Sequence, residues 1–277
     1  MDIIKRYMKK LAQITNMDEM KILPGHLAFY LVLSLIPAVT LVGMVCNMLG
    51  ISNADVIEFF DETAPTGVVE IIKPFFTSSG ANMALIYLII GFILISNGAY
   101  AIILASNTLY KIEDTSQLKG RIKAFFLTIL LMFLFVFILT VLAFGNEIGS
   151  FILELEAFGS ISNSIYNIFI YLKWPVAFIV IYIIIKMIYT VAPDQNVKSK
   201  SVTKGSIFTT ICWLLITAIY SFYANNIARY DMFYGNLSNI IILMMWIYVI
   251  AYIFVIGIAI NVNNHNIMEE NVNNNKQ

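Results

Sequence analysis

An uncharged stretch near the C-terminus most constrains what this chain can fold into. From Met232 to Asn264 the sequence contains no Asp, Glu, Lys, Arg or His. That is far longer than the roughly 20 apolar residues with which an α-helix crosses the hydrocarbon core of a bilayer. We therefore predict a transmembrane helix here, preceded by a turn at Tyr234 and Gly235 and ending in a polar tail after Gly257 and Asn261.

The composition of the whole chain extends this conclusion. Of its 277 residues 60% are hydrophobic and 12% are charged, whereas a typical soluble domain is about 25% charged. So many apolar side chains cannot be hidden in one soluble core, so the lipid bilayer must be the solvent for most of the chain. The net charge is zero, which gives no indication of a nucleic-acid or acidic partner.

Runs without acidic or basic side chains predict an all-α integral membrane protein with a bundle of six transmembrane helices. This bundle occupies residues 25–261, after an amphipathic interfacial helix at 1–24 and before a polar cytoplasmic tail at 262–277. Short amphipathic helices are expected in the outer loop at 51–80. The predicted spans lie at about residues 26–48, 84–108, 124–145, 170–190, 206–226 and 237–260.

The basic residues set the orientation of this bundle. Most of the 17 Lys and Arg side chains fall on the side that holds both termini, while acidic side chains such as Asp55, Glu58 and Glu147 collect on the other. Cytoplasmic loops of membrane proteins carry an excess of Lys and Arg. We therefore expect a multi-pass protein of the plasma (inner) membrane with both termini in the cytoplasm.

Prolines mark two of the predicted spans. Pro37 removes one backbone hydrogen bond and should bend the first helix near Leu33, where Ser34 is placed to supply a partner. The bend is either a packing kink or a hinge beside a polar cavity. In the fourth span, Lys173-Trp174-Pro175 suggests that the crossing begins there, with residues 161–172 along the outer surface.

The second span is the most polar. Ser96 and Asn107 are eleven residues apart, about three helical turns, so they share one face, and Asn97 and Thr108 repeat that spacing beside them. Because amide groups that face lipid would lack partners, this face should point into the bundle. It either joins helices by hydrogen bonds or lines a route for a polar or amphipathic solute.

The sequence contains no recognisable enzyme chemistry. His26 and His265 are the only histidines, and Cys46 and Cys212 both lie in apolar runs. Phosphate-binding, dinucleotide-binding and zinc-protease motifs are absent, and the basic residues are dispersed as topology signals. We therefore expect no catalytic residues, no cofactor, no metal site and no nucleic-acid partner.

Four stretches together resemble the YihY/BrkB family of bacterial inner-membrane proteins, formerly called ribonuclease BN-like. They are Leu27–Val42, Ser96–Tyr110, Ile188–Trp213 and Tyr234–Asn261. The family motifs match this chain at Tyr30, Pro37, Tyr234, Gly235, Trp246, Gly257 and Asn261.

The resemblance implies a role in envelope integrity or in moving lipid-like molecules. One departure is Ala259, which stands where the family usually has Glu. Our hypothesis is a transporter or flippase-like protein whose polar groove carries an amphipathic envelope component. The groove residues would be Ser34, Ser96, Asn97, Asn107 and Asn226. The alternative is a non-transporting scaffold for the envelope, and an RNA-cleaving enzyme is the least favoured function.

Overall fold

The computed structural model describes residues 13–48, 84–112, 116–132, 162–226 and 238–274, together with residues 52, 54, 57, 58 and 73. Throughout these ranges the regular structure is helical, and none of them contains a strand. The elements are α2 (Glu19–Met48), α5 (Ala84–Leu109), α7 (Ser162–Val191), α8 (Thr203–Asn226) and α10 (Ser238–Asn274), with a further helix at 117–132.

The described residues confirm the predicted all-helical fold. Within the described ranges, three segments are long and apolar enough to cross a bilayer: Gly91–Leu109, Thr203–Tyr220 and Ile240–His265. A shorter apolar helix covers Phe178–Val191. Residues 1–12, the rest of the outer loop at 51–80 and residues 133–145 of the predicted third span lie outside the described residues, so the bundle of six spans stays a prediction.

Three helices extend beyond the limits expected from the sequence. α2 begins at Glu19, so the last residues assigned to an interfacial helix continue into the first span. α7 is one continuous helix with Pro175 inside it, rather than a crossing that starts at Lys173. A single missing backbone hydrogen bond is tolerated where apolar sequence continues on both sides of the proline. α10 remains helical to Asn274, through most of the predicted tail.

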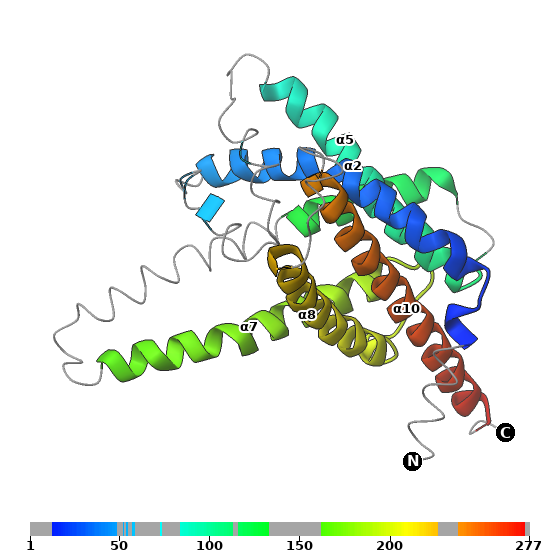
Figure 1. Cartoon of the computed structure of the whole chain (residues 1–277). Helices are drawn as coiled ribbons and strands as arrows, with labels where there is room; N and C mark the ends of the chain where they lie inside the picture. Colours follow the sequence, from blue (N-terminus) through cyan, green and yellow to red (C-terminus); the bar gives the residue numbers. More distant parts are fainter. Residues whose placement is uncertain are drawn as a thin grey trace.

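α10 is the central helix of the described bundle. It contacts α2, α5 and α8, while α2 packs along α5 and α7 packs on α8 (Figure 1). Small side chains such as Ala101, Ala105 and Ala251 are fully or almost fully buried in this core, which lets the helix axes approach closely. Larger buried side chains, including Ile103, Ile185 and Ile258, fill the space between them.

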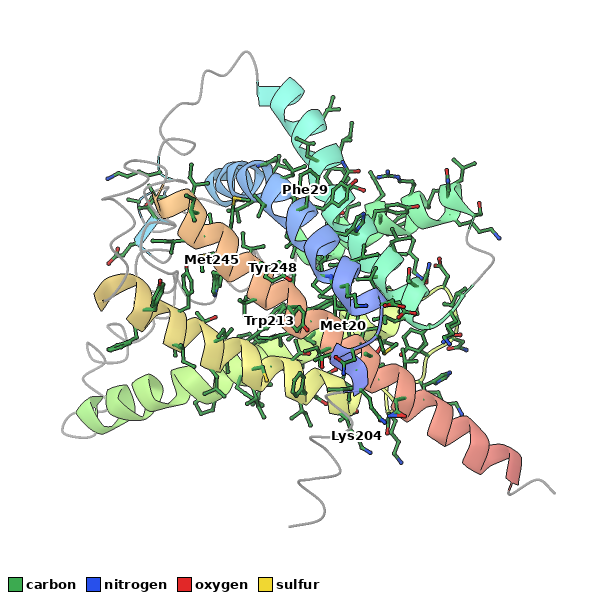
Figure 2. All side chains as sticks on the ribbon, turned by 45° about the vertical axis from the view of Figure 1, so that its right-hand side comes forward. Met20, Phe29, Lys204, Trp213, Met245 and Tyr248 are labelled. Carbon is green, nitrogen blue, oxygen red and sulfur yellow. The ribbon has the colours of Figure 1, made fainter. Side chains whose placement is uncertain are left out.

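α8 and α10 run antiparallel, and hydrogen bonds join them along their length. From one end to the other, the bonded pairs are Gly205 with Asn261, Trp213 with Ile250, Thr217 with Trp246 and Tyr220 with Ile242. The start of α8 therefore lies beside the second half of α10. Figure 2 shows Lys204 and Met20 toward this same end of the molecule, with Met245 away from it.

This arrangement gathers the basic side chains at one end of the bundle, which we call the basic end. α5 and α7 finish there, and α2, α8 and the 117–132 helix begin there. The basic residues at or beside these helix ends are Lys111, Lys119, Arg121, Lys123, Lys198, Lys200 and Lys204. Away from it the outer surface is apolar, with Ile93, Leu215 and Phe222 among the exposed side chains.

Candidate functional site

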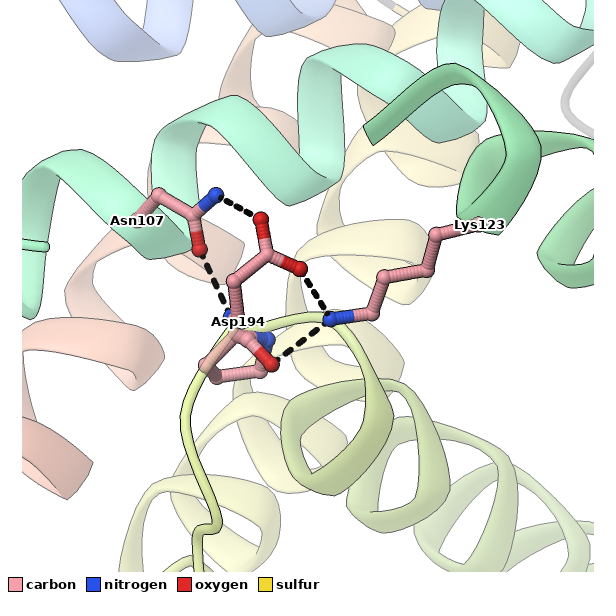
Figure 3. A network of polar contacts seen from close by, with 4 residues as sticks. Asn107, Lys123 and Asp194 are labelled. Atoms are coloured by element: carbon pink, nitrogen blue, oxygen red, sulfur yellow. Dashed lines mark hydrogen bonds and ion pairs between the residues drawn. The ribbon is translucent and has the colours of Figure 1, made fainter. Parts of the chain in front are cut away.

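A polar network at the basic end joins three segments that are distant in the sequence (Figure 3). Asn107, on α5, donates from Nδ2 to Oδ2 of Asp194 at 2.6 Å and accepts the backbone N–H of Asp194 at 2.9 Å. Lys123, on the 117–132 helix, donates from Nζ to Oδ1 of Asp194 at 2.6 Å and to the carbonyl oxygen of Pro193 at 2.7 Å. Asp194 thus fixes the α7–α8 loop to both other helices.

The carboxyl group of Asp194 is stabilised in its charged form. Partial burial opposes ionisation, but the hydrogen bonds from Lys123 and Asn107, together with the charges of Lys123 and Lys119, outweigh it and lower the pKa of Asp194. The side chains of Lys123 and Asp194 are 23% and 22% exposed, so water only partly screens this ion pair. The network is therefore strongest when the carboxylate is ionised.

The end of α5 has a backbone geometry that positions Asn107. The N–H of Ile112 bonds to the carbonyl of Asn107 at 3.0 Å and that of Lys111 to the carbonyl of Thr108 at 3.1 Å, which is the Schellman arrangement. Lys111 sits at the left-handed position with φ 55°, where glycine is usual. No glycine in the sequence marks this helix end, so propensity alone could not place it.

A second polar cluster forms where α8 and α10 come closest. A Cβ atom added to Gly205 would lie 2.2 Å from the carbonyl oxygen of Gly257, so the two backbones approach more closely than any larger residue permits. The hydroxyl of Tyr189 donates to the carbonyl of Phe254 at 2.8 Å and shares a hydrogen bond of 2.8 Å with Thr209. This cluster connects α7, α8 and α10 through buried groups.

Two asparagines on α10 complete this contact. Asn261 accepts the backbone N–H of Gly205 at 2.8 Å, and Asn264 donates to the carbonyl of Ser201 at 2.7 Å. Both amides are buried; Asn261 satisfies one of the first N–H groups of α8, which have no partner within the helix, and Asn264 satisfies a carbonyl just before α8. The two amides therefore fix the register between the helices.

Four polar atoms in the described interior are buried without a hydrogen-bond partner. They are Nδ1 of His26, the hydroxyls of Ser106 and Tyr110, and Nδ2 of Asn261. These residues come from α2, from the end of α5 and from α10, three elements that contact one another, and all lie toward the basic end. We call this set the three-helix junction. Such groups cost about 1–3 kcal/mol each when left unsatisfied, and intramembrane polar groups commonly mark functional sites.

The predicted groove residues are distributed over several contacts. Ser34 is buried against Gly98 of α5, and its hydroxyl bonds to the carbonyl of Leu31 rather than to that of Leu33. Asn97 accepts a 2.6 Å hydrogen bond from Arg121, which also lies over the ring of Tyr100.

The remaining three groove residues are Asn107, Ser96 and Asn226. Asn107 belongs to the Asp194 network, as described above, and Ser96 is half-buried. The side chain of Asn226, at the end of α8, lies outside the described residues. The groove as such stays a prediction, because Ser34, Asn97 and Asn107 lie in three separate contacts.

The predicted family positions mostly fall at helix contacts. The ring of Tyr30 packs edge-on against His26 at 4.9 Å, Pro37 lies opposite Gly91, and Trp246 donates to Thr217 at 3.3 Å. Gly257 and Asn261 form the α8–α10 cluster, and Ala259 is buried on α10. Tyr234 and Gly235 lie outside the described residues.

Sequence reasoning missed several residues that the structure brings into these sites. Asp194 lies in the connection between the fourth and fifth predicted spans, and Tyr189, Gly205 and Thr209 are polar or small residues inside apolar runs. An aspartate directly after an apolar span, followed by lysines, was the available signal for Asp194. Among the described residues, no three His, Cys, Asp or Glu side chains are grouped so that they could hold a metal ion.

Comparison with known sequences adds a family and several relatives. The sequence model of the family described as virulence factor BrkB matches residues 11–277. The putative ribonuclease-like protein YfkH of Bacillus subtilis strain 168 is 27% identical over 260 residues, covering 92% of this chain and 94% of the relative. Two further relatives match less than half of the chain.

A UPF0761 membrane protein of Glaesserella parasuis serovar 5 is 24% identical, covering 40% of this chain and 38% of its own length. The UPF0761 membrane protein IL2447 of Idiomarina loihiensis is 25% identical, covering 43% of this chain and 41% of its own. No solved structure matches the chain.

Proposed function

We propose a transport function from one premise, which is that the chain belongs to the virulence factor BrkB family of membrane proteins. The proposed protein crosses the plasma membrane six times, keeps both termini in the cytoplasm and moves an amphipathic, lipid-like envelope component across the bilayer. The basic end supports this orientation, since Lys and Arg favour the cytoplasmic face.

The observation that carries the proposal is the three-helix junction. A solute with a polar headgroup needs hydrogen-bond partners while it passes through hydrocarbon, because a polar group there without partners costs several kcal/mol. Nδ1 of His26, the hydroxyls of Ser106 and Tyr110, and the Nδ2 amino group of Asn261 offer both donors and acceptors without a partner in the described interior. In the proposal, these groups bind the headgroup while its hydrocarbon part stays in the lipid.

The Asp194 network has a complementary part in this proposal. It ties the end of α5 to the α7–α8 loop beside the junction, so the network must loosen before a headgroup enters from the cytoplasm. The proposed role is not enzymatic, although the printed name of the Bacillus subtilis relative calls it ribonuclease-like. An RNA-cleavage assay on the purified protein tests this part, since measurable cleavage would contradict it.

Reconstituted vesicles provide the main test. The purified full chain is placed in vesicles that contain a phospholipid with a fluorescent headgroup, and transfer between leaflets is followed by chemical quenching from outside. We expect transfer above that of protein-free vesicles, and a severalfold slower rate for Ser106→Ala, which removes one unpartnered buried hydroxyl.

Ser206→Ala is the matched control. Ser206 is equally buried, but its hydroxyl already bonds to the carbonyl of Val202 at 2.8 Å, so its loss should leave the transfer rate near that of the wild type. Equal rates for Ser106→Ala and the wild type would remove the junction from the proposal. No transfer above protein-free vesicles would reject this class of substrate.

A further inference from the structure

A shallow groove on the outer side of the bundle lies beside the basic end. Its volume is about 400 Å³, and its walls are mostly apolar. Lys119 and Lys123 line one end, and Phe126, Leu130 and Val191 line the rest. The groove lies between the 117–132 helix and the end of α7, and none of its lining residues belongs to the three-helix junction.

The 117–132 helix orders these side chains along one face. Lys119, Lys123, Phe126 and Leu130 follow one another at spacings of four, three and four residues, so they form a single stripe. The stripe begins with two ammonium groups at the basic end and continues as apolar surface toward the middle of the bundle. A phospholipid has the same order, with a phosphate at the interface and an acyl chain below it.

The charges at the groove favour an anionic headgroup. Lys123 is occupied by Asp194, whereas the side chain of Lys119 is exposed at the mouth of the groove. The helix begins at residue 117, so the positive end of its dipole and its first backbone N–H groups lie beside Lys119. Phe126 is 63% exposed and Val191 40% exposed, which leaves apolar surface for a lipid chain.

We propose that this groove binds one anionic phospholipid of the cytoplasmic leaflet, with its phosphate at Lys119 and an acyl chain along Phe126 and Leu130. Such a lipid would remain bound beside the Asp194 network and is not itself the transported solute. The site therefore stands or falls independently of the proposed transport function. Basic pockets at the cytoplasmic side of membrane helices are a known mode of lipid recognition.

The test compares two lipids that differ only in their headgroups. The purified full chain in detergent is titrated with phosphatidylglycerol or with phosphatidylcholine of identical acyl chains, and bound lipid is counted by native mass spectrometry. We expect the wild type to prefer phosphatidylglycerol. Lys119→Gln should weaken phosphatidylglycerol binding by about fivefold, the effect of one basic side chain near an anionic lipid, and leave phosphatidylcholine unchanged.

Two control variants are matched to the two halves of the site. Lys204→Gln removes an exposed lysine at the start of α8, outside the groove, and should retain the preference. Phe126→Ala should weaken the binding of both lipids. Phe222→Ala should weaken the binding of neither, although Phe222 is 62% exposed and Phe126 is 63% exposed. Size-exclusion profiles verify that all four variants are folded.

Three outcomes would overturn the proposal. In the first, the wild type would bind the two lipids with equal affinity. In the second, Lys119→Gln and Lys204→Gln would lose the same affinity for phosphatidylglycerol, which would indicate general surface attraction. In the third outcome, inorganic phosphate at millimolar concentration would displace phosphatidylglycerol from the wild type. That result would assign the site to a soluble anion.

Discussion

The α8–α10 and α2–α5 contacts both use glycine, but they differ in how closely the helices approach. A Cβ atom on Gly205 would lie 2.2 Å from a backbone oxygen of α10, whereas one on Gly98 would lie 3.1 Å from Oγ of Ser34. At Gly91 the nearest atom, Cβ of Pro37, would be 3.3 Å away. The first pair is limited by a backbone atom, whereas the atoms nearest to an added Cβ in the second pair belong to side chains.

Hydrogen bonding follows the same division. Bonds between side chains and backbone join α8 to α10 along its length, while Ser34, at the α2–α5 contact, bonds within its own helix. Interhelical hydrogen bonds and close backbone approach are what hold membrane helices together, since lipid supplies no hydrophobic driving force. We therefore expect α7, α8 and α10 to form the fixed part of the described bundle, with movement easier between α2 and α5.

The largest expected effect is at the tightest point of the fixed part. Gly205→Ala should lower the free energy of unfolding by at least about 3 kcal/mol, because the new methyl group meets the Gly257 backbone, which cannot move without separating the helices. Thermal unfolding in detergent measures the loss. Gly25→Ala is the control, since nothing lies within 4 Å of a Cβ there. Equal stability of the two variants would contradict the close contact.

Removing the Tyr189 hydroxyl tests how much the hydrogen bonds contribute to the stability of the fixed part. Tyr189→Phe deletes the group that bonds to Thr209 and to the carbonyl of Phe254, and we expect a loss of about 1 to 2 kcal/mol. The same unfolding measurement applies. An unchanged unfolding temperature would show that backbone approach alone holds the pair.

Acid should weaken the link between the two parts. Since the pKa of Asp194 is lowered in the folded protein, its contribution is complete above the unfolded value of about 3.9 and is lost as the pH falls through the folded pKa. We expect Asp194→Asn to be less stable than the wild type at pH 7, by up to about 1 kcal/mol for a partly exposed pair.

The difference in stability between the wild type and Asp194→Asn should shrink as the pH falls below the pKa of the unfolded carboxyl group. Unfolding temperatures of both proteins, measured side by side from pH 7 to pH 3, give this difference. A gap that stays constant over this range would show that the carboxylate charge does not stabilise the network.

The smallest effect is expected at the α2–α5 contact. Gly98→Ala gains about 0.5 to 1 kcal/mol from helix propensity but must displace Oγ of Ser34 by a few tenths of an ångström. We therefore expect a net change of less than about 1 kcal/mol in unfolding. A loss as large as that of Gly205→Ala would mean that the two contacts are equally rigid.

The sequence predicts the helices better than the contacts between them. Runs without charged residues located the cores of α2, α5, α8 and α10, because the length of an apolar run is set by the thickness of the bilayer. The ends were less predictable. α5 ends at Leu109 with Lys111 rather than glycine at the left-handed position, and α10 continues as helix through Asn-rich sequence with low helix propensity.

The candidate sites depend on partners that the chain brings from far away. Asn107 was singled out as an inward-facing amide, yet its partner Asp194 is 87 positions away and the Lys123 that completes the network comes from another helix. Gly205 and Gly257 likewise gain meaning only when the two backbones meet. Periodicity describes one helix at a time, so it cannot show which helix faces which.

The length of α10 has a mechanical consequence. At about 1.5 Å per residue its 37 residues span about 55 Å, while the hydrocarbon core is about 30 Å thick. A substantial part of this long helix therefore extends into water, and a small tilt around the midpoint of its membrane-embedded part displaces its C-terminal end by a larger distance. The displacement of a fluorophore near Asn274 would thus report even a small rearrangement of the helices that contact α10.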